Sequence, residues 1–344
     1  MLIAPYAGSK KIMIVTAQQL LENPLNTYRH VVLLGAGASR AACPDGDASG
    51  RCLPLMSDLM SVINLLPLFD KAGIEIGEER NFEVIYSQLF GKPEYADTIK
   101  EVERRIEDYF SSLSLPSRAT IYDRILVSLR PTDAVFTFNW DPFLFDAYQR
   151  NRDAVPLPEI FFLHGNIRIG ACRDHDIWGA RAGRCPDCRQ LFSNVPLLYP
   201  ILQKDYSEPY IHRSMEVAKV MFSNAFTITI FGYGAPDSDV FAVDMLRRAW
   251  YKDHPRALEH IEIIDTELSS ILEERWSPFT PTHHYQIRKT FEESRIALWP
   301  RRTCESWLPP MTKGIPCDKF PITNTDSLKE LQAHAASIAR YEVS

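Results

Sequence analysis

The segment HVVLLGAGASR, residues 30–40, decides the fold prediction. Four apolar residues, Val31–Leu34, run directly into the turn Gly35-Ala36-Gly37. An all-apolar run that ends at glycines is typical of a strand buried in a parallel sheet. Glycines let the backbone turn sharply and approach a ligand closely, and a helix that begins near Ser39 would point free N–H groups at a phosphate. The segment therefore predicts a strand, a turn and a helix at a dinucleotide site.

This turn departs from the usual dinucleotide fingerprint, because the third glycine of G-x-G-x-x-G would fall on Arg40. A turn of this kind is a structural feature about as often as it holds a nucleotide, so both interpretations stay open on this segment alone. The small, polar residues 41–51 that follow predict a surface loop. Such a loop either closes over a ligand or simply connects two elements.

Composition limits the class of protein. The chain has 344 residues, 45% of them hydrophobic, which suits one large domain or two with a sizeable core. Its formal charge of −6 argues against direct nucleic-acid binding. We find neither a signal peptide nor a run of about 18 apolar residues that would span a membrane. Seven cysteines, an odd number, suit a reducing compartment, so we expect a cytoplasmic protein.

Further along the chain, helical spacing alternates with short β-prone runs. Apolar residues recur at three- and four-residue spacing between Leu53 and Leu129, as in the stripe from Leu59 to Leu66, which predicts a helical insertion. Strands are predicted at residues 12–15, 134–138, 160–163, 226–231 and 260–264, and a helix is predicted from the N-cap Thr16 through Glu22. Ligands of open α/β sheets bind at the carboxyl ends of the strands. The candidate ends are Gly35–Ser39, Asn139–Asp141, His164–Asn166, Gly232–Gly234 and Asp265–Thr266.

These patterns predict an α/β fold, a Rossmann-like parallel sheet with a helical insertion and a small zinc-ribbon module. We place the main domain at residues 1–275, with the insertion at about 56–130 and the zinc module at about 167–195. A C-terminal extension, residues 276–344, is rich in proline and aromatic residues and ends in a helix after the capping box of Ser327 and Glu330. We expect the extension to pack on the domain; an interface with a partner is the alternative.

A metal site is predicted by two pairs of ligands, Cys172-x2-His175 and Cys185-x2-Cys188. Paired ligands at this spacing are how a chain closes a tetrahedral zinc site, and four protein ligands make the zinc structural. Asp174 or Asp176 is the alternative to His175 as fourth ligand. Three thiols without a metal remain the other interpretation.

Several short motifs, taken in order, carry a family resemblance. GAGAS at 35–39, TFNWD at 137–141, HG at 164–165, the zinc pairs and FGY at 231–233 together resemble the SIR2 (sirtuin) superfamily over residues 29–270. The resemblance implies a Rossmann-like NAD domain with a smaller zinc and helical module. It also implies cleavage of NAD between nicotinamide and ribose.

The residue types of these motifs suit that chemistry. Asn139 can hold a water or a ribose hydroxyl, His164 can take a proton near neutral pH, and Asp141 can orient the ribose or Asn139. Each is also a common turn or strand-end residue, which is the alternative reading of any one of them. The predicted NAD-binding residues are Gly35, Ala36, Gly37, Ala38, Ser39, Gly232, Tyr233, Gly234, Asp265 and Thr266.

Within the superfamily, the sequence departs from the protein deacylases. Their Gly-Ile-Pro-Asp-Phe-Arg type segment has only Leu53–Met56 as a counterpart here, and Tyr199–Leu202 offers no clear equivalent of their peptide-pairing segment. Residues 232–239, GYGAPDSD, and Trp140 look like the NAD-hydrolysing branch of bacterial anti-phage defence proteins, whereas the zinc motif is more characteristic of deacylases.

We therefore predict an NAD+ hydrolase that releases nicotinamide and ADP-ribose, a triggered NAD-depleting effector. An NAD-dependent lysine deacylase and a non-enzymatic NAD or ADP-ribose binding module are the alternatives. A freely active enzyme would kill its host, so we expect a homo-oligomer or an activating partner of helicase or phage type.

Overall fold

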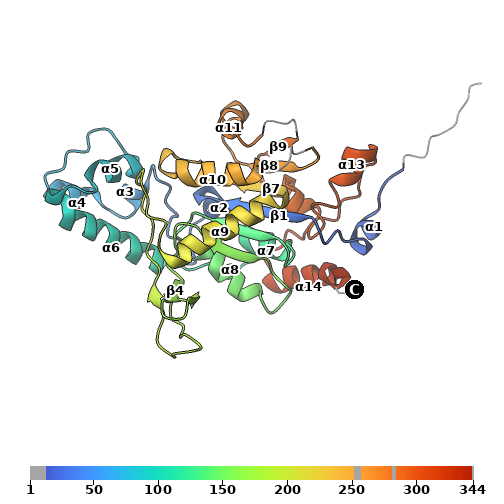
Figure 1. Cartoon of the computed structure of the whole chain (residues 1–344), viewed down its shortest axis with the longest axis horizontal. Coiled ribbons are helices and arrows are strands. Elements are labelled where there is room, and N and C mark those ends of the chain that lie inside the picture. The colour runs from blue at the N-terminus through green and yellow to red at the C-terminus, as the bar shows by residue number, and fades with distance from the viewer. Residues whose placement is uncertain (1–12, 252–256, 281–283, 343–344) are drawn as a thin grey trace, which may run out of the picture.

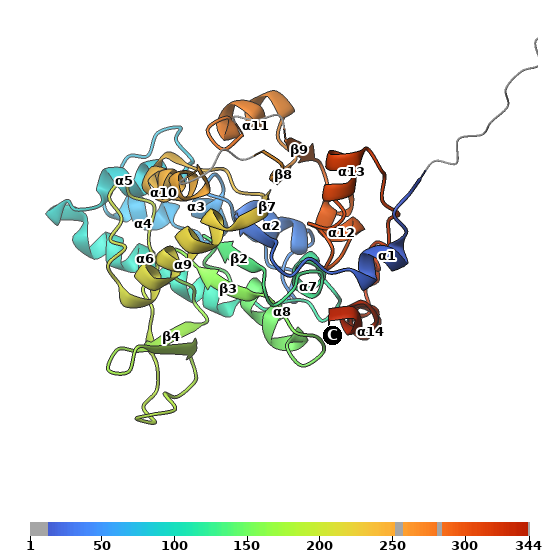
Figure 2. The same cartoon turned by 45° about the vertical axis from the view of Figure 1, so that its right-hand side comes forward.

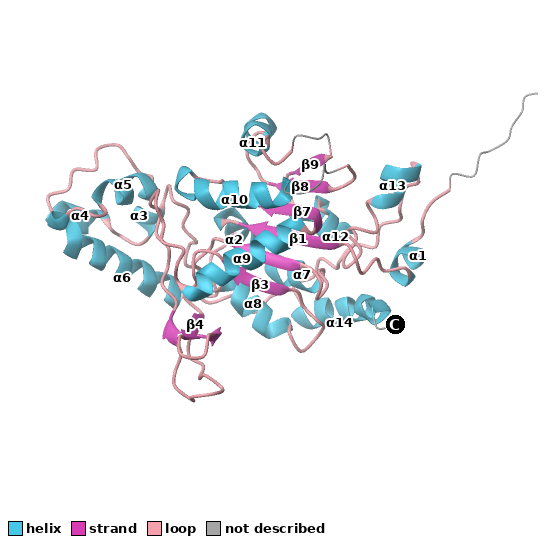
Figure 3. Ribbon diagram, viewed as in Figure 1, coloured by secondary structure: helices cyan, strands magenta, loops and turns pink. Residues whose placement is uncertain are grey.

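A six-stranded parallel sheet forms the centre of the molecule, with strand order β3-β2-β1-β7-β8-β9. The structure, a computed structural model, describes residues 13–251, 257–280 and 284–342 (Figure 1). The α/β, Rossmann-like prediction is confirmed (Figure 3). The strands are β1 (Arg29–Leu34), β2 (Ala134–Thr137), β3 (Glu159–Phe162), β7 (Ala225–Phe231), β8 (His260–Ile264) and β9 (Tyr285–Arg288).

The opening segment forms the middle of this sheet. In β1, Val31–Leu34 are at most 1% exposed, and Leu33 lies opposite Phe136 of β2 and Ile230 of β7. A strand that is paired on both edges and covered on both faces has no position for a polar residue to face water. The uninterrupted apolar run is the local cause of its central place, and it brings the turn at Gly35 to the middle of the sheet's carboxyl edge.

Helices cover both faces of the sheet. Helix α7 (Ile121–Val127) lies against α2 (Ala36–Ala42) and α8 (Phe143–Asn151), and α9 (Pro209–Ser223) lies against α10 (Val240–Tyr251) on the opposite side (Figure 2). Among the described residues, no helix is both long and apolar enough to cross a bilayer.

The sheet extends beyond the domain boundary expected at residue 275. Strand β9 pairs in parallel with β8, so the extension supplies an edge strand of the same sheet. Only four residues long and half-buried throughout, β9 gives no clear period-two pattern. The extension therefore belongs to the fold. Its remaining elements are α11 (Ser269–Trp276), at the boundary, and α12 (Arg295–Leu298), α13 (Leu308–Lys313) and α14 (Leu328–Ala339).

The extension also packs at the amino ends of the central strands. Most residues from Ser294 to Trp307 are buried, including the charged side chains of Arg301 and Arg302. At the start of the chain, α1 (Ala17–Glu22) begins after the predicted cap Thr16. The strand predicted at Ile12–Val15 is not part of the sheet: Val15 makes one isolated bridge to Cys317, and Ile12 lies outside the described residues.

The helical insertion forms a lobe beside the carboxyl edge of the sheet (Figure 1). The stripe predicted at Leu59–Leu66 is broken into two short helices, because Asn64 has a left-handed φ of 55° and Pro67 is the second residue of the next helix, which begins at Leu66. Helix α7, expected within the insertion, instead joins the layer on the sheet. The lobe consists of α3 (Leu59–Val62), α4 (Leu66–Lys71), α5 (Phe82–Leu89) and α6 (Ala96–Ser112).

A small antiparallel sheet between β3 and α9 carries the predicted metal ligands. Its order is β5-β4-β6, with β4 (Ile169–Cys172), β5 (Ile177–Ala180) and β6 (Ser193–Asn194). Trp178 of this module packs edge-on against Tyr210 of α9, with centroids 5.8 Å apart, and Arg213 lies over its ring. These contacts anchor the module on α9.

Candidate active site

A cavity of about 1020 Å³ lies where the carboxyl ends of β1, β2, β3, β7 and β8 meet the helical lobe. This volume is at the upper limit of the size range of small-molecule sites, roughly 300–1000 Å³. All five predicted strand ends contribute to its wall. The predicted site residues that line it are Gly35, Ala36, Gly37, Ser39, Asn139, Asp141, His164, Gly232, Tyr233, Gly234, Asp265 and Thr266.

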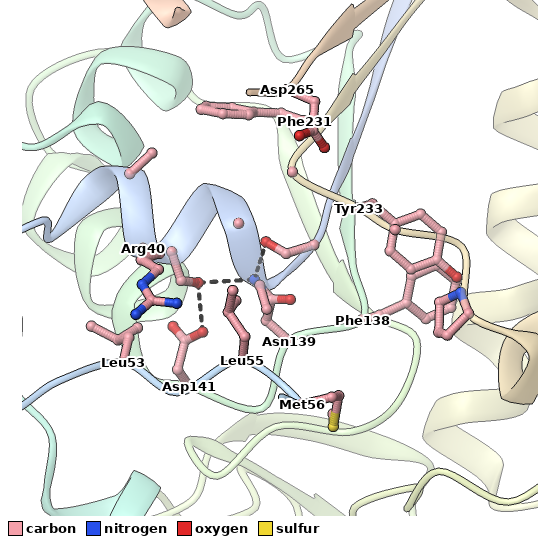
Figure 4. A pocket seen from close by; sticks show the side chains of 18 of the residues that line it. Arg40, Leu53, Leu55, Met56, Phe138, Asn139, Asp141, Phe231, Tyr233 and Asp265 are labelled. Atoms are coloured by element: carbon pink, nitrogen blue, oxygen red, sulfur yellow. Dashed lines mark hydrogen bonds between the residues drawn. The ribbon is translucent and has the colours of Figure 1, made fainter. Parts of the chain in front are cut away.

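Ala38 is the predicted binding residue that does not line this cavity; it is fully buried in α2. Figure 4 shows Asp265 and Phe231 toward one end of the site, Asp141, Leu53 and Met56 toward the other, and Asn139 between them. The residues at these two ends of the site differ in character.

The glycines let two turns touch each other. The Gly35 N–H donates to the carbonyl of Phe231 at 3.0 Å, and that of Gly37 donates to the carbonyl of Gly232 at 2.9 Å. A Cβ on Gly35 would come within 2.5 Å of the Gly232 carbonyl oxygen, and Gly232 has a left-handed φ of 58°. Close packing between the ends of β1 and β7 thus requires glycine here, whatever else the turn binds.

Helix α2 begins at Ala36 and not near Ser39, because Gly35 takes an extended conformation and serves as its N-cap. The N–H of Gly37 is already used by Gly232, so this helix end offers fewer free donors than the sequence suggests. Ser39 lies one turn into the helix and is only 1% exposed. Its hydroxyl is used within the protein.

Asn139 is held by its amide nitrogen. Nδ2 donates to the carbonyl oxygen of Gly35 at 2.8 Å and to Oγ of Ser39 at 2.9 Å. Its backbone N–H is bound by the Thr137 hydroxyl, 3.0 Å away. The carboxamide oxygen points away from the dashed hydrogen bonds of Nδ2 (Figure 4). A fixed nitrogen with an oxygen directed elsewhere makes this side chain an oriented hydrogen-bond acceptor.

Ser39 connects Asn139 to Asp141. Its hydroxyl donates to Oδ2 of Asp141 at 2.6 Å and lies 2.5 Å from the hydroxyl of Tyr122 on α7. The other carboxylate oxygen of Asp141 accepts the N–H of Phe143 at the start of α8. Burial raises the pKa of Asp141 to about 6, although the hydrogen bond from Ser39 favours the ionised form. Asp141 is therefore a carboxylate that titrates close to neutral pH.

The turn that carries Asn139 and Asp141 is tied to the end of β3 by Asn166. Its side-chain nitrogen donates to the backbone carbonyls of Asp141, at 2.7 Å, and Asn139, at 3.3 Å. Asn166 is 1% exposed. The sequence predicts that Asn166 lies at a strand end, but it does not predict this contact.

His164 lies beside an ion pair that the sequence did not predict. Asp239 Oδ1 is 2.7 Å from Nζ of Lys204 and 3.5 Å from Nε2 of His164, and the hydroxyl of Tyr233 donates to Oδ2 at 2.8 Å. Burial lowers the pKa of His164 to about 4; Asp239 acts in the opposite direction and Lys204 in the same one. His164 is therefore neutral at physiological pH.

Aromatic rings frame this side of the site. Phe138 stacks on Tyr233 (Figure 4), with ring centroids 4.6 Å apart. It meets the His164 ring edge-on at the same centroid distance. These contacts fix the imidazole plane between the ends of β2, β3 and β7.

The wall is mostly apolar at the end of the cavity near Leu53 and Met56. It combines the loop after α2 with α6 of the lobe and the Trp140 ring, which meets Phe110 edge-on at 5.9 Å. The apolar lining residues there are Leu53, Leu55, Met56, Leu59, Phe110, Trp140 and Leu198. Arg40 also lines the cavity and pairs with Asp58 at 3.1 Å. The sequence pattern identifies Arg40 only as the residue in place of a third glycine and does not predict its position in this wall.

The loop predicted at residues 41–51 is built around one carboxylate. Asp47, only 5% exposed, accepts hydrogen bonds from the backbone N–H groups of Ser49, Arg51 and Ser114 and from the Arg51 guanidinium. The loop is thereby fastened to the end of α6. It holds Leu53–Met56 against the cavity.

The predicted metal ligands converge outside this cavity. Their ligand atoms all lie within 4.8 Å of one another, with Cys172 Sγ 3.4 Å from His175 Nδ1 and 3.7 Å from Cys188 Sγ. Two sulfurs bound tetrahedrally at about 2.3 Å from zinc would be about 3.8 Å apart. These donors fit a zinc ion with His175 as the fourth ligand. None of the four lines the cavity, which suits a structural site.

No protein-family model and no curated protein matches this chain. Among solved structures it is similar to a mutant Sir2 homologue in complex with ADP-ribose, at 14% identity over 95% of this chain and 98% of the other, with a TM-score of 0.38. A structure described as concerning the mechanism and regulation of Sir2 enzymes is 12% identical over 94% and 95%, TM-score 0.37. A Sir2 mutant with a peptide and NAD is 14% identical over 86% and 96%, TM-score 0.34.

Proposed function

We propose that the chain is an NAD+ glycohydrolase, which cleaves the bond between nicotinamide and ribose and releases nicotinamide and ADP-ribose. The observation that carries the proposal is the position of Asn139. Its amide nitrogen is bound by Gly35 and Ser39, its oxygen is free to accept, and Asp141 lies two residues away in the same cavity wall. An oriented acceptor next to a buried carboxylate is suited to attack by water on a cationic carbon.

The reaction balances without a further reactant. The bond between the ribose anomeric carbon and the pyridinium nitrogen breaks, its electron pair stays with nicotinamide, and water adds to the carbon and loses a proton. Positive charge develops on the ribose in the transition state. Asp141 in its ionised form opposes that charge, and the Asn139 oxygen accepts a hydrogen bond from the incoming water.

The two ends of the cavity support an elongated ligand with a base at each end. The apolar wall around Trp140 and Phe110 suits the departing nicotinamide, and the carboxylate of Asp265 after β8 suits the hydroxyls of the second ribose. His164, neutral under these conditions, serves as a hydrogen-bond acceptor rather than a cation. In this proposal NAD+ is the substrate, and zinc at Cys172, His175, Cys185 and Cys188 is structural.

The proposal also includes a role for this activity in the cell. The GYGAPDSD segment at 232–239 resembles the defence branch described above, so we infer a triggered NAD-depleting effector whose activity awaits an oligomer or a partner protein. This part of the proposal is tested by measuring NAD+ turnover as a function of protein concentration and on addition of phage lysate.

The direct test incubates the purified chain with NAD+ and separates the products by chromatography. Equal amounts of nicotinamide and ADP-ribose without any peptide support hydrolysis, and Asn139→Ala should lower the rate by about 100-fold or more. Asn26→Ala, an exposed asparagine outside the cavity, is the matched control. Nicotinamide release only with an acylated peptide would instead identify a deacylase. NAD+ binding without turnover under any of these conditions would identify a binding module.

A further inference from the structure

His164 stands next to a buried ion pair that the hydrolysis chemistry above does not use. We propose that Asp239 is a positioning residue that holds His164 in the tautomer with its proton on Nε2, and that Lys204 is the counter-charge that keeps Asp239 ionised. The structural part of this proposal stands on the contacts alone. Its consequence for catalysis rests on the proposed function.

The contacts bring three separate segments to one point. Lys204 comes from the segment between the zinc module and α9, Asp239 from the turn after β7, and His164 from the end of β3. Their side chains are 2%, 5% and 6% exposed. Lys204 also donates to the backbone carbonyl of Ser238, next to Asp239. A buried ammonium and a buried carboxylate at 2.7 Å keep each other charged, because either one alone would lose its charge on burial.

The neighbours of Nε2 determine where the imidazole proton lies. Two oxygens face this nitrogen, Oδ1 of Asp239 and the hydroxyl of Tyr206, each at 3.5 Å. An ionised carboxylate can only accept hydrogen bonds, and a neutral imidazole carries a single N–H. The proton is therefore favoured on Nε2, and the lone pair is left on Nδ1. An imidazole held this way offers Nδ1 as its acceptor.

The same contacts would also form if the ion pair were only a tether. Lys204 and Asp239 would then only fasten the segment before α9 to the turn after β7, and the state of the His164 ring would be indifferent to them. The imidazole tautomer separates the two roles, because it responds to the charge beside Nε2 and not to the tethering of the chain.

The experiment measures by NMR which ring nitrogen of His164 carries the proton. The sample is the ligand-free full chain labelled with ¹⁵N-histidine, and His164→Gln identifies the His164 signal. Because Asp239→Asn alone would leave a buried ammonium unpaired, the informative variant is Lys204→Met combined with Asp239→Asn, which keeps the pair neutral. Asp237→Asn is the matched control, since Asp237 is exposed, does not line the cavity and lies two residues away.

We expect the Nε2–H tautomer in the native protein and in the control, and a mixed or Nδ1–H state in the double variant. A native Nδ1–H tautomer, or a double variant that keeps the native tautomer, would overturn the proposal. In turnover assays kcat of the double variant should fall by about 10- to 100-fold with KM changed less than about threefold. If the native protein does not hydrolyse NAD+, the proposed function fails while the tautomer measurement still decides this inference.

Discussion

The hydroxyl of Ser39 donates to the carboxylate of Asp141 at 2.6 Å, across 102 positions of sequence. A serine has one proton to give, so the same oxygen accepts from Asn139 and from Tyr122, which lie 2.9 and 2.5 Å away. Asn139 and Asp141, the two residues proposed to act on the substrate, are thus both held by the Ser39 hydroxyl. Ser39, predicted from sequence as a ligand-binding residue, has its hydroxyl turned toward these two side chains, and its role toward NAD+ stays a prediction.

Removing this hydroxyl should change the pH dependence of turnover. The pKa of Asp141 is about 6, and the Ser39 hydrogen bond stabilises its ionised form. An acid whose ionised form loses a donor gains a proton more readily, so in Ser39→Ala the acid limb of kcat/KM should move to higher pH, by about one unit. Rates measured between pH 5 and pH 8 check this, with the exposed Ser337→Ala as control.

Two outcomes would contradict that prediction. An acid limb that stays in place in Ser39→Ala would show that Asp141 does not set it. A limb that persists in Asp141→Asn would point to another titrating group in the cavity.

A second test concerns the attachment of the extension. Arg301 and Arg302 are fully buried, and Glu342 is the carboxylate that faces both, at 3.1 Å from Nη1 of Arg302. Arg301 also donates to the carbonyl of Leu129 at 2.8 Å, close to the end of α7. Replacing Glu342 by Gln would leave two buried guanidinium groups without their shared counter-charge. We expect a loss of about 3 kcal/mol in the free energy of unfolding.

Urea denaturation of Glu342→Gln measures this loss, and Glu78→Gln, at an exposed site in the lobe, is the control. A midpoint unchanged from the native protein would mean that the extension is held without this carboxylate. NAD+ binding by the folded variant should be preserved, since Glu342 does not line the cavity.

The strands that form the cavity were predictable from sequence because each is an apolar run with a clear local end. β8 was predicted with the bounds that it has, β2, β3 and β7 to within one residue, and β1 to within two. The zinc ligands were equally local, since each pair is separated by two residues. The cavity wall at Asn139, His164 and Tyr233 followed from the rule that ligands bind at strand ends.

What the sequence did not reveal depends on contacts between distant segments. Lys204 lies in a stretch without periodicity, and its partner Asp239 is 35 residues further on. Strand β9 is too short to show a period, and only its pairing with β8 identifies it. Glycines 35 and 37 were assigned to a ligand, whereas their immediate neighbour is the turn at Gly232.

Metal removal provides a third prediction. The ligand atoms of Cys172, His175, Cys185 and Cys188 converge as a tetrahedral zinc site requires. Cys185→Ser should abolish stoichiometric zinc in the purified protein and lower its melting temperature, because metal binding is coupled to folding. Zinc content by atomic absorption and thermal unfolding with and without chelator check this. Cys52→Ser, an exposed thiol far from the cluster in sequence, should keep its zinc; purified native protein without zinc would refute the site.

The stability of the sheet should fall in mild acid because of a buried histidine. His30 in β1 has ring nitrogens 2.9 and 2.8 Å from the hydroxyls of Thr303 and Thr229, and burial lowers its pKa from 6.5 to about 4. His30 therefore becomes protonated near pH 6.5 in the unfolded chain but only near pH 4 in the folded chain. Stability from this group is complete above pH 6.5 and is lost as the pH falls toward 4, by about 2–3 kcal/mol.

Urea unfolding at pH 7 and at pH 4.5 should show a smaller difference in the free energy of unfolding for His30→Gln than for the native protein, whereas the exposed His212→Gln should keep the native difference. An equal pH dependence in His30→Gln and the native chain would mean that acid acts on the other buried histidines, His164 and His260, and not through β1.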